Sequence, residues 1–223
     1  MSSRDHTKHK YDECFAKLVL EKFFFDRYGT LVLSDKPDLR ARENTIGIEV
    51  VNAVPQGTQE ALSLASKIAN DNDSESKNND RIRILKKRGY NYTKYGMSHP
   101  SISYSYDPFH PIVISESPLK EILFRFEEKV RKLNGSGYSA LARYDLFIYS
   151  ERYIGDDFIT PLITAFLDRN NNLRKYSFVY VFSLNGIHEF DLINATHVVI
   201  DTDKNKKVWG IPEAAWELAN NGE

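Results

Sequence analysis

The spacing of apolar residues predicts alternating helices and short strands along the chain. From Tyr11, apolar side chains recur every three or four residues, as they do on one face of a helix, and this pattern ends near Gly29. Short β-branched runs follow at 30–33 and 45–53, on either side of the polar segment 36–42. This order predicts a helix followed by a β-meander.

The middle of the chain has weaker periodicity. A break at 55–58 precedes an apolar stripe that predicts a helix over about 58–70. Residues 70–80 include no apolar side chain, so we expect a flexible polar insertion near 70–80. Residues 81–88 form a basic amphipathic segment, and residues 89–111 lack regular periodicity and are expected to be an ordered loop.

The second half of the chain again alternates between the two periodicities. Its clearest amphipathic pattern lies at 119–133, where Ser117 supplies an N-cap, Pro118 opens the helix and residues 134–137 end it. The other expected elements are strands at 112–114, 145–149, 176–182, 188–192 and 197–200, and helices at 158–167 and 212–220. Together these patterns predict a single α/β domain over residues 1–223.

Composition narrows the class of protein. Hydrophobic residues make up 41% of the 223 residues, with 13 Phe and 13 Tyr, which is enough to build a sizeable core. Lys and Arg total 30 against 31 Asp and Glu, so any nucleic-acid binding must come from a local basic face.

The cysteine content and the apolar runs bear on the cellular location. The single cysteine, Cys14, excludes an internal disulfide and a cysteine-rich zinc finger, and it favours a reducing compartment. No apolar run approaches the roughly 20 residues of a membrane-spanning helix, and residues 1–10 lack the apolar stretch of a signal peptide. We therefore expect a cytoplasmic protein with no membrane partner.

The candidate chemistry is an acidic pair, Asp38 and Glu49. Hydrolysis of a phosphodiester is assisted by a divalent cation, and magnesium prefers oxygen ligands, commonly one or two carboxylates with water. Asp38 follows Pro37, and Glu49 lies eleven residues later within the otherwise apolar segment 46–51. Because side chains alternate across a strand, Glu49 shares a face with Val51, and a hairpin could bring Glu49 beside Asp38.

Pro37-Asp38, then Glu49 in an apolar strand, then a helix, all preceded by an amphipathic helix and a short strand, resembles the PD-(D/E)XK nuclease superfamily. The resemblance covers about residues 11–70 and implies a restriction-endonuclease-like fold, with a mixed β-sheet flanked by helices. It also implies that Asp38 and Glu49 hold Mg²⁺ or Mn²⁺ for the hydrolysis of DNA, and it allows a homodimer. The family's lysine, two residues after the second acid, is replaced here by Val51.

Val51 leaves two functional interpretations open. Some members of the superfamily carry the lysine or a glutamine on the following helix, which makes Lys67 the first choice and Gln59 a poorer one. Otherwise the domain keeps the nuclease-like fold and binds DNA or a protein partner without cutting it.

A purely structural interpretation of the acidic pair also stays open. Pro37-Asp38 is suitable turn chemistry, and Glu49 could pair with Arg40 or Arg42 across the hairpin. An acid within an apolar strand needs either such a partner or a metal ion, because burying an unpaired carboxylate is unfavourable.

A second candidate is a basic segment interleaved with tyrosines. Basic side chains neutralise phosphates and aromatic rings stack on bases, so this composition suits a DNA-binding surface. The alternative is a solvated basic helix followed by an aromatic-packed loop. The basic residues are Arg81, Arg83, Lys86, Lys87, Arg88 and Lys94.

Two further patterns carry less weight. Gly135-Ser136-Gly137-Tyr138 matches a dinucleotide fingerprint by letters, but it follows a helix instead of a strand, so we interpret it as a helix stop. His188, Glu189 and Asp191, with His197 nearby, are residue types that bind transition metals. Alternation places His188 and Glu189 on opposite faces, so the pattern predicts a strand with polar surface residues.

Overall fold

The computed structural model describes residues 11–41, 43, 45–53, 60–61, 64, 67–68, 75–87, 90–95, 99–104, 118–138, 140–150, 153–202 and 210–221, with the backbone alone at 90–95, 99–104, 118 and 221. In chain order the elements are α1 (Tyr11–Phe23), α2 (Phe25–Tyr28), β1 (Leu31–Leu33), β2 (Leu39–Ala41), β3 (Ile46–Asn52), α4 (Glu75–Lys87), β4 (Tyr90–Tyr95), β5 (His99–Tyr104), α5 (Pro118–Leu133), β6 (Arg143–Tyr149), α6 (Asp156–Arg169), β7 (Tyr176–Ser183), β8 (Gly186–Asp191), β9 (Thr196–Ile200) and α8 (Ile211–Asn221). The chain divides into two compact units, residues 1–53 with 118–223 and residues 54–117.

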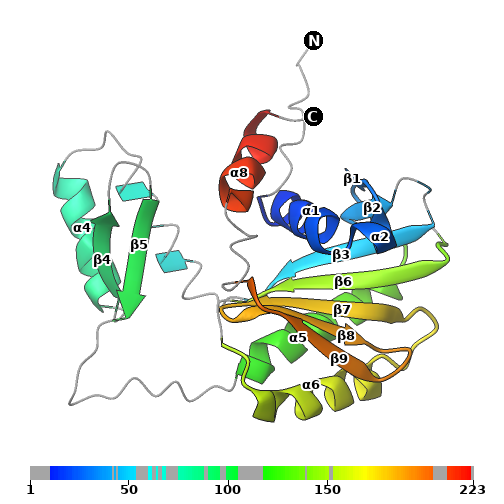
Figure 1. Ribbon diagram of the computed structural model, residues 1–223. Coiled ribbons are helices and arrows are strands. Elements are labelled where there is room, and N and C mark those ends of the chain that lie inside the picture. Colours follow the sequence, from blue (N-terminus) through cyan, green and yellow to red (C-terminus); the bar gives the residue numbers. More distant parts are fainter. Residues whose placement is uncertain are drawn as a thin grey trace. The chain divides into compact units, whose positions relative to one another are not determined.

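The first unit is built on a mixed sheet (Figure 1). Within the described residues the sheet has seven strands in the order β1-β2-β3-β6-β7-β8-β9. The β3–β6 and β6–β7 pairs are parallel, and the pairs at both ends of the sheet are antiparallel. The two parallel pairs require crossover connections, and α5 and α6 precede β6 and β7 in these connections.

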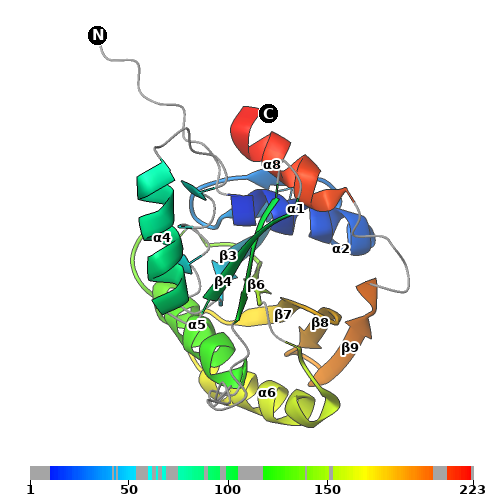
Figure 2. The ribbon, with the colours of Figure 1, turned by 90° about the vertical axis from the view of Figure 1, so that its left-hand side faces the viewer.

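Helices cover both faces of this sheet (Figures 1 and 2). Along β6, Phe147 points into the core beneath α1 and α2, whereas Leu146 and Ile148 point into the core beneath α5 and α6. This alternation is the period of two expected for a strand that is buried on both sides. Helix α8 packs against α1 through the buried Ala215.

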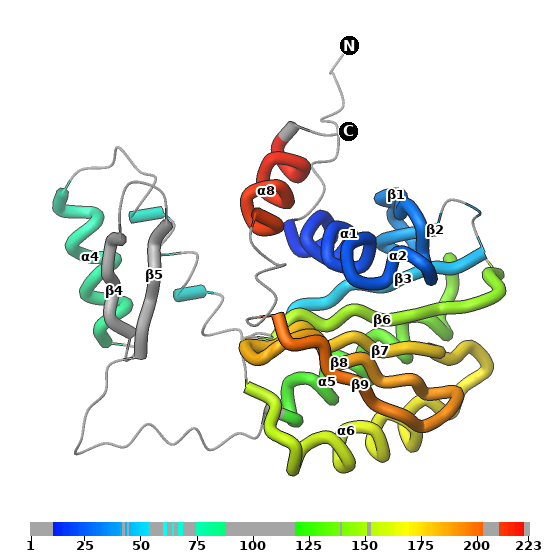
Figure 3. The backbone as a smooth tube through the Cα atoms, in the orientation of Figure 1, coloured from blue at the N-terminus to red at the C-terminus, as the bar shows by residue number. Residues whose placement is uncertain are grey.

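The C-terminal strands form a meander that completes the sheet, and Figure 3 traces the backbone from β7 through β8 to β9. Strand β9 is paired only with β8 within the described residues, and it is the least buried strand of this sheet. The α/β architecture, with a mixed sheet between helices, therefore agrees with the pattern of the sequence.

The second unit has its own small core. Leu85 of α4 is fully buried against Ala61, with Leu64 and Ile68 partly buried beside them. Strands β4 and β5 form an antiparallel hairpin in the same unit. The expected helix over 58–70 is described only in part, and its described positions are helical.

Two expectations for this unit are wrong. Residues 75–80, expected as part of a loop, instead begin α4, and the buried Leu85 anchors this helix. Residues 70–74 lie outside the described residues, so the flexible insertion itself stays a prediction. The loop expected over 89–111 instead contains β4 and β5. The strand expected at 112–114 lies outside the described residues, and the single-domain organisation stays a prediction. Among the described helices, none combines the length and hydropathy needed to cross a membrane.

Candidate functional site

The β2–β3 hairpin positions Asp38 directly opposite Glu49. Leu39 pairs with Ile48 in the antiparallel ladder, so the residues next to them, Asp38 and Glu49, face each other across the hairpin. The Pro37 ring packs directly on Gly47, where an added Cβ would lie 2.6 Å from Leu141 and closer still to Pro37. Gly47 therefore lets the Pro37-Asp38 segment approach β3 closely.

Glu49 is buried on the face of β3 that α5 covers. Its flanking residues Ile48 and Val50 lie in the core beneath α1, so alternation directs the Glu49 carboxylate toward α5. The residue is only 2% exposed. A carboxylate at this depth requires a cation or several hydrogen-bond donors.

Lys129 of α5 supplies the cation. Its Nζ lies 2.5 Å from Oε2 of Glu49 and 3.1 Å from Oδ2 of Asp38, so one ammonium bridges both acids. The Val50 N–H donates to the same Asp38 oxygen at 2.7 Å. Phe126, Val130 and Leu133 bury the inner face of α5 and so fix the helix that carries Lys129.

Burial and the ion pairs act in opposite directions on the pKa values at this site. Burial raises the pKa of Glu49, and Lys129 only partly opposes that rise. Burial alone would lower the pKa of Lys129, but the Glu49 and Asp38 carboxylates outweigh it and the pKa of the ammonium is raised. Lys129 is therefore held in its charged form between the two acids.

Tyr138 extends the site beyond the end of α5. Burial, together with the nearby Glu49 carboxylate, raises the pKa of the Tyr138 hydroxyl. Oε1 of Glu49 is buried and accepts no hydrogen bond of normal geometry from any residue that the structure describes. The site thus combines two convergent carboxylates, one unfilled acceptor, an ammonium and a phenol.

This donor set fits a hard divalent cation. Both acids contact one point, which Lys129 Nζ occupies, and Oε1 of Glu49 accepts no hydrogen bond of normal geometry from the described residues. Magnesium and manganese commonly take one or two carboxylates and complete their coordination with water and phosphate oxygens. Among the described residues there is no group of three or more His, Cys, Asp or Glu side chains arranged to hold a metal ion.

No family model, curated protein or solved structure matches this chain. The functional assignment therefore depends on the geometry of the chain's own residues.

The structure brings together the two acids that the sequence pointed to, with a lysine that it did not. Lys129 was not predicted, although it lies three residues after the buried Phe126 and four before Leu133, on a helix face that is otherwise apolar. Lys67 lies in the unit formed by residues 54–117, and its role stays a prediction.

The purely structural interpretation named two arginines as partners for Glu49. The cation that contacts Glu49 is Lys129, whereas Arg40 donates to the Lys36 carbonyl oxygen at 2.7 Å. Arg42 lies outside the described residues.

The predicted DNA-binding residues belong to the unit that contains α4. Arg83, Lys86 and Lys87 are exposed on α4, and Arg83 forms an exposed ion pair with Asp80 at 3.1 Å. Arg81 donates to Asn78 at 3.0 Å. Arg88 lies outside the described residues, and Lys94 is described only by its backbone in β4. A basic helix face is present in this unit, and its binding of DNA stays a prediction.

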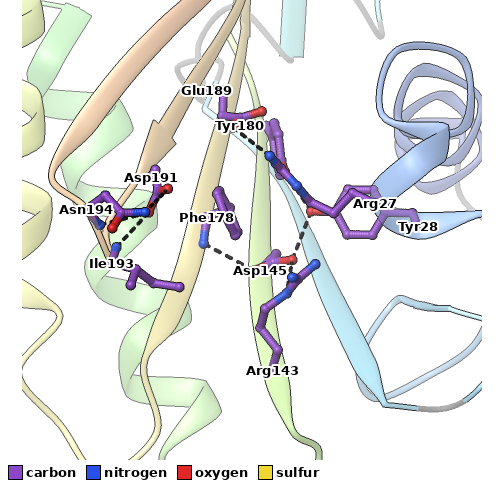
Figure 4. Close-up of polar contacts among 10 residues, drawn as sticks. All are labelled: Arg27, Tyr28, Arg143, Asp145, Phe178, Tyr180, Glu189, Asp191, Ile193 and Asn194. Carbon is purple, nitrogen blue, oxygen red and sulfur yellow. Dashed lines mark hydrogen bonds and ion pairs between the residues drawn. The ribbon is translucent and has the colours of Figure 1, made fainter.

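A second buried acid, Asp145, lies on the opposite face of the sheet (Figure 4). It accepts hydrogen bonds from the Tyr28 hydroxyl at 2.8 Å, from Arg143 at 3.0 Å and from the Phe178 N–H at 3.1 Å. Burial raises the pKa of Asp145 to about 6, against the opposing effect of Arg143. With its acceptor positions occupied, Asp145 acts as the centre of a structural polar network.

The network continues from Asp145 toward the surface (Figure 4). The Tyr28 and Tyr180 hydroxyls lie 2.8 Å apart, and Arg27 donates to Tyr180 and to Glu189, the latter at 2.9 Å. Arg27 also stacks over the Phe178 ring at 4.0 Å. These contacts tie α2 to β7 and β8 without using the Asp38 and Glu49 carboxylates.

The late-strand histidines form a pair. Nδ1 of His188 lies 3.1 Å from Nε2 of His197, and Phe190 packs beside both rings. His188 and Glu189 point to opposite faces, as alternation predicted, since Glu189 contacts Arg27 on the α2 side. Burial lowers the pKa of His188 to about 4, with a smaller lowering effect from His197 and an opposing one from Asp156.

We expect this histidine to make the protein sensitive to acid. In the unfolded state His188 has its usual pKa of 6.5, whereas in the native state its pKa is about 4. Between these pH values the unfolded state binds more protons than the native state, so the free energy of unfolding falls as the pH falls. His188→Leu should remove about 2 kcal/mol of the loss seen between pH 7 and pH 4.5. Urea unfolding of both proteins at the two pH values measures this difference. Equal pH dependence in the two proteins would contradict the prediction.

Proposed function

We propose that this chain is a metal-dependent nuclease that hydrolyses DNA phosphodiester bonds, with a restriction-endonuclease-like fold. One observation carries the proposal. Asp38 and Glu49 converge across a hairpin, and a lysine from a neighbouring helix stands between them. Two carboxylates and a lysine are the residue types that the PD-(D/E)XK resemblance implies for the site.

The position of Lys129 supports the proposal despite Val51. Val51 shares a strand face with Glu49, and it can neither donate a hydrogen bond nor carry a charge. Lys129 brings an ammonium to the same carboxylates from α5. We propose that Lys129 takes the role of the lysine missing from the strand.

Each residue at the site would have a separate role in the proposed hydrolysis. Asp38 and Glu49 would hold Mg²⁺ or Mn²⁺, which when bound would polarise the phosphate and promote deprotonation of the attacking water. The Val50 N–H fixes the orientation of the Asp38 carboxylate. Lys129 would donate hydrogen bonds to a phosphate oxygen or to the attacking water.

The order of elements also supports the proposal. A helix, a short strand, the hairpin that carries the acids and a later helix lie around one mixed sheet. The resemblance was based on this order with the helix expected over 58–70, which belongs to the unit formed by residues 54–117. The helix that serves the site is α5, which lies beyond residues 54–117 in the sequence.

DNA is proposed as the substrate because the chain combines a candidate phosphodiester-cleaving site with a local basic segment. The net charge of the whole chain is -1, so a general electrostatic attraction to DNA is absent. The exposed basic residues of α4 are of the type that contacts phosphates.

The second candidate function is a binding module without catalysis, for DNA or a protein partner. The ion pairs of Lys129 with both acids favour it, since a lysine that pairs with the buried Glu49 and the half-buried Asp38 stabilises the fold without a metal. The two candidates differ in whether Asp38 and Glu49 are needed for cleavage.

Cleavage of plasmid and linear DNA with Mg²⁺ or Mn²⁺ separates the candidates. We expect Asp38→Asn and Glu49→Gln to lower the cleavage rate at least about 100-fold, because each change removes a charged metal ligand while keeping its shape. Glu217→Gln, an exposed acid on α8, is the matched control and should cleave like the wild type. Equal rates for all four proteins would reject the nuclease.

A further inference from the structure

We propose that Lys129 is a resident cation that a divalent metal ion must displace, so that metal ion and phosphodiester enter the site together. This inference rests on the proposed function and adds that binding of the metal ion depends on binding of the phosphodiester.

The ammonium stands where the two carboxylates converge. Lys129 Nζ contacts Oε2 of Glu49 at 2.5 Å and Oδ2 of Asp38 at 3.1 Å, so a metal ion sharing these oxygens would compete for the same space. Oδ2 of Asp38 is also held by the Val50 N–H, which limits its freedom to turn toward another position. The lysine side chain is therefore the part of the site that can move.

The surroundings of Lys129 allow that movement. The backbone of α5 is anchored by fully buried Phe126 and Leu133, whereas the lysine stem is flexible and its side chain retains 11% exposure. The ammonium can leave the carboxylates while the helix stays in place. Oε1 of Glu49, which accepts no hydrogen bond of normal geometry from the described residues, would then be a second oxygen for the arriving metal ion.

Charge couples the metal ion to the substrate. The two acids and Lys129 together carry one net negative charge, and a divalent ion added beside the lysine would make the site positive. The Lys129 ammonium and a metal ion a few ångströms away would repel each other strongly, because little water reaches this site. Glu49, for example, is only 2% exposed. One phosphodiester charge restores neutrality and gives the displaced ammonium a new partner.

Metal binding and phosphodiester binding should therefore be positively coupled. By linkage, each ligand raises the affinity for the other by the same factor. Replacing Lys129 by a neutral side chain should remove the competitor, so that the metal ion binds well without any phosphodiester present.

Calorimetric titration with Mn²⁺ in the absence of DNA tests this rule. At pH 8 we expect Lys129→Met to bind Mn²⁺ at least about tenfold more tightly than the wild type, since a competing positive charge is gone. Lys132→Met, which removes an exposed charge one turn away on α5, is the matched control and should match the wild type.

A labelling experiment on the wild-type protein gives a second readout that needs no variant. An amine-reactive acylating reagent should modify Lys129 slowly in the metal-free protein, because the ammonium is paired and mostly buried. Added Mn²⁺ together with a phosphorothioate oligonucleotide duplex should accelerate this modification, measured by mass spectrometry, and leave the exposed Lys132 unchanged as an internal control.

The outcomes separate the inference from the proposed function. Equal Mn²⁺ affinity in wild type and Lys129→Met, or Lys129 labelling that Mn²⁺ and the duplex do not change, overturns the displacement rule and leaves the nuclease proposal to its cleavage test. Absence of Mn²⁺ binding in every protein, with or without the duplex, overturns both.

Discussion

Lys129→Ala should lower the free energy of unfolding by about 3–5 kcal/mol, because it leaves two carboxylates without their cation. Glu49 contributes most of this effect, since it is 2% exposed and Lys129 is the cation in contact with it. Asp38 keeps the Val50 N–H and is 17% exposed, so it suffers less. Urea unfolding at pH 7 measures the change.

Three comparisons make this expectation specific. Lys132→Ala on the same helix should change stability by no more than about 0.5 kcal/mol, as exposed substitutions usually do. The loss of unfolding free energy in Lys129→Ala should shrink as the pH falls from 7 toward 5. Burial raises the pKa of Glu49, and the variant lacks the lysine that opposes this rise. The native variant therefore takes up a proton at Glu49 before its unfolded state does, and this uptake stabilises it. Glu49→Gln added to Lys129→Ala should also recover part of the loss. A deficit below about 1 kcal/mol would contradict the prediction.

Asp145→Ala should cost about 3–5 kcal/mol, because the change removes the acceptor at the centre of the network in Figure 4. The Tyr28 hydroxyl, the Arg143 guanidinium and the Phe178 N–H would all lose a hydrogen bond in a buried setting. Thermal or urea unfolding reports the loss.

Asp145→Asn and Asp191→Ala are the matched controls for this change. Asparagine keeps an oxygen for the Phe178 N–H while losing the charge, so its deficit should be smaller than that of alanine. Asp191 accepts from Asn194 and Ile193 in an exposed turn, and its removal should cost about 1 kcal/mol. If the two Asp145 variants were equally stable, hydrogen bonding would not be the source of the effect.

The hairpin with its two acids could be located from the sequence because the signals there are local. Apolar alternation over Ile46–Val51 placed Glu49 on one face, and Pro37-Asp38 marked the start of the partner strand. Strand β3 lies within the strand predicted at 45–53, whereas β2 lies in the segment 36–42, for which no strand bounds were predicted. The burial of Ile48 and Val50 beneath α1 follows the same period of two.

Lys129 could not be located from local signals, because it lies 80 residues after Glu49 and contacts it only when α5 packs on β3. One trace of it exists in the sequence. On the helix 119–133, Lys129 follows Phe126 by three residues and precedes Leu133 by four, which puts a charge on the apolar stripe. A lysine in that position needs a buried acid opposite it.

The errors in residues 70–111 have a different origin. Polar composition over 70–80 indicated that no core could form there, but the core contact of α4 is supplied later in the sequence by Leu85. The hairpin β4–β5 is rich in Tyr and Ser and contains Pro100, so its alternation is weak. Tertiary context decided both elements.

The first unit is formed by two stretches of the chain, residues 1–53 and 118–223, and this affects the order in which its parts are synthesised. The chain leaves this unit after Ala53 and returns at Pro118, so Asp38 and Glu49 are synthesised well before Lys129. Strand β3 also cannot pair with β6, its parallel neighbour, until β6 has been synthesised. On the ribosome, the paired acids therefore remain without their lysine until the whole intervening segment and α5 have emerged.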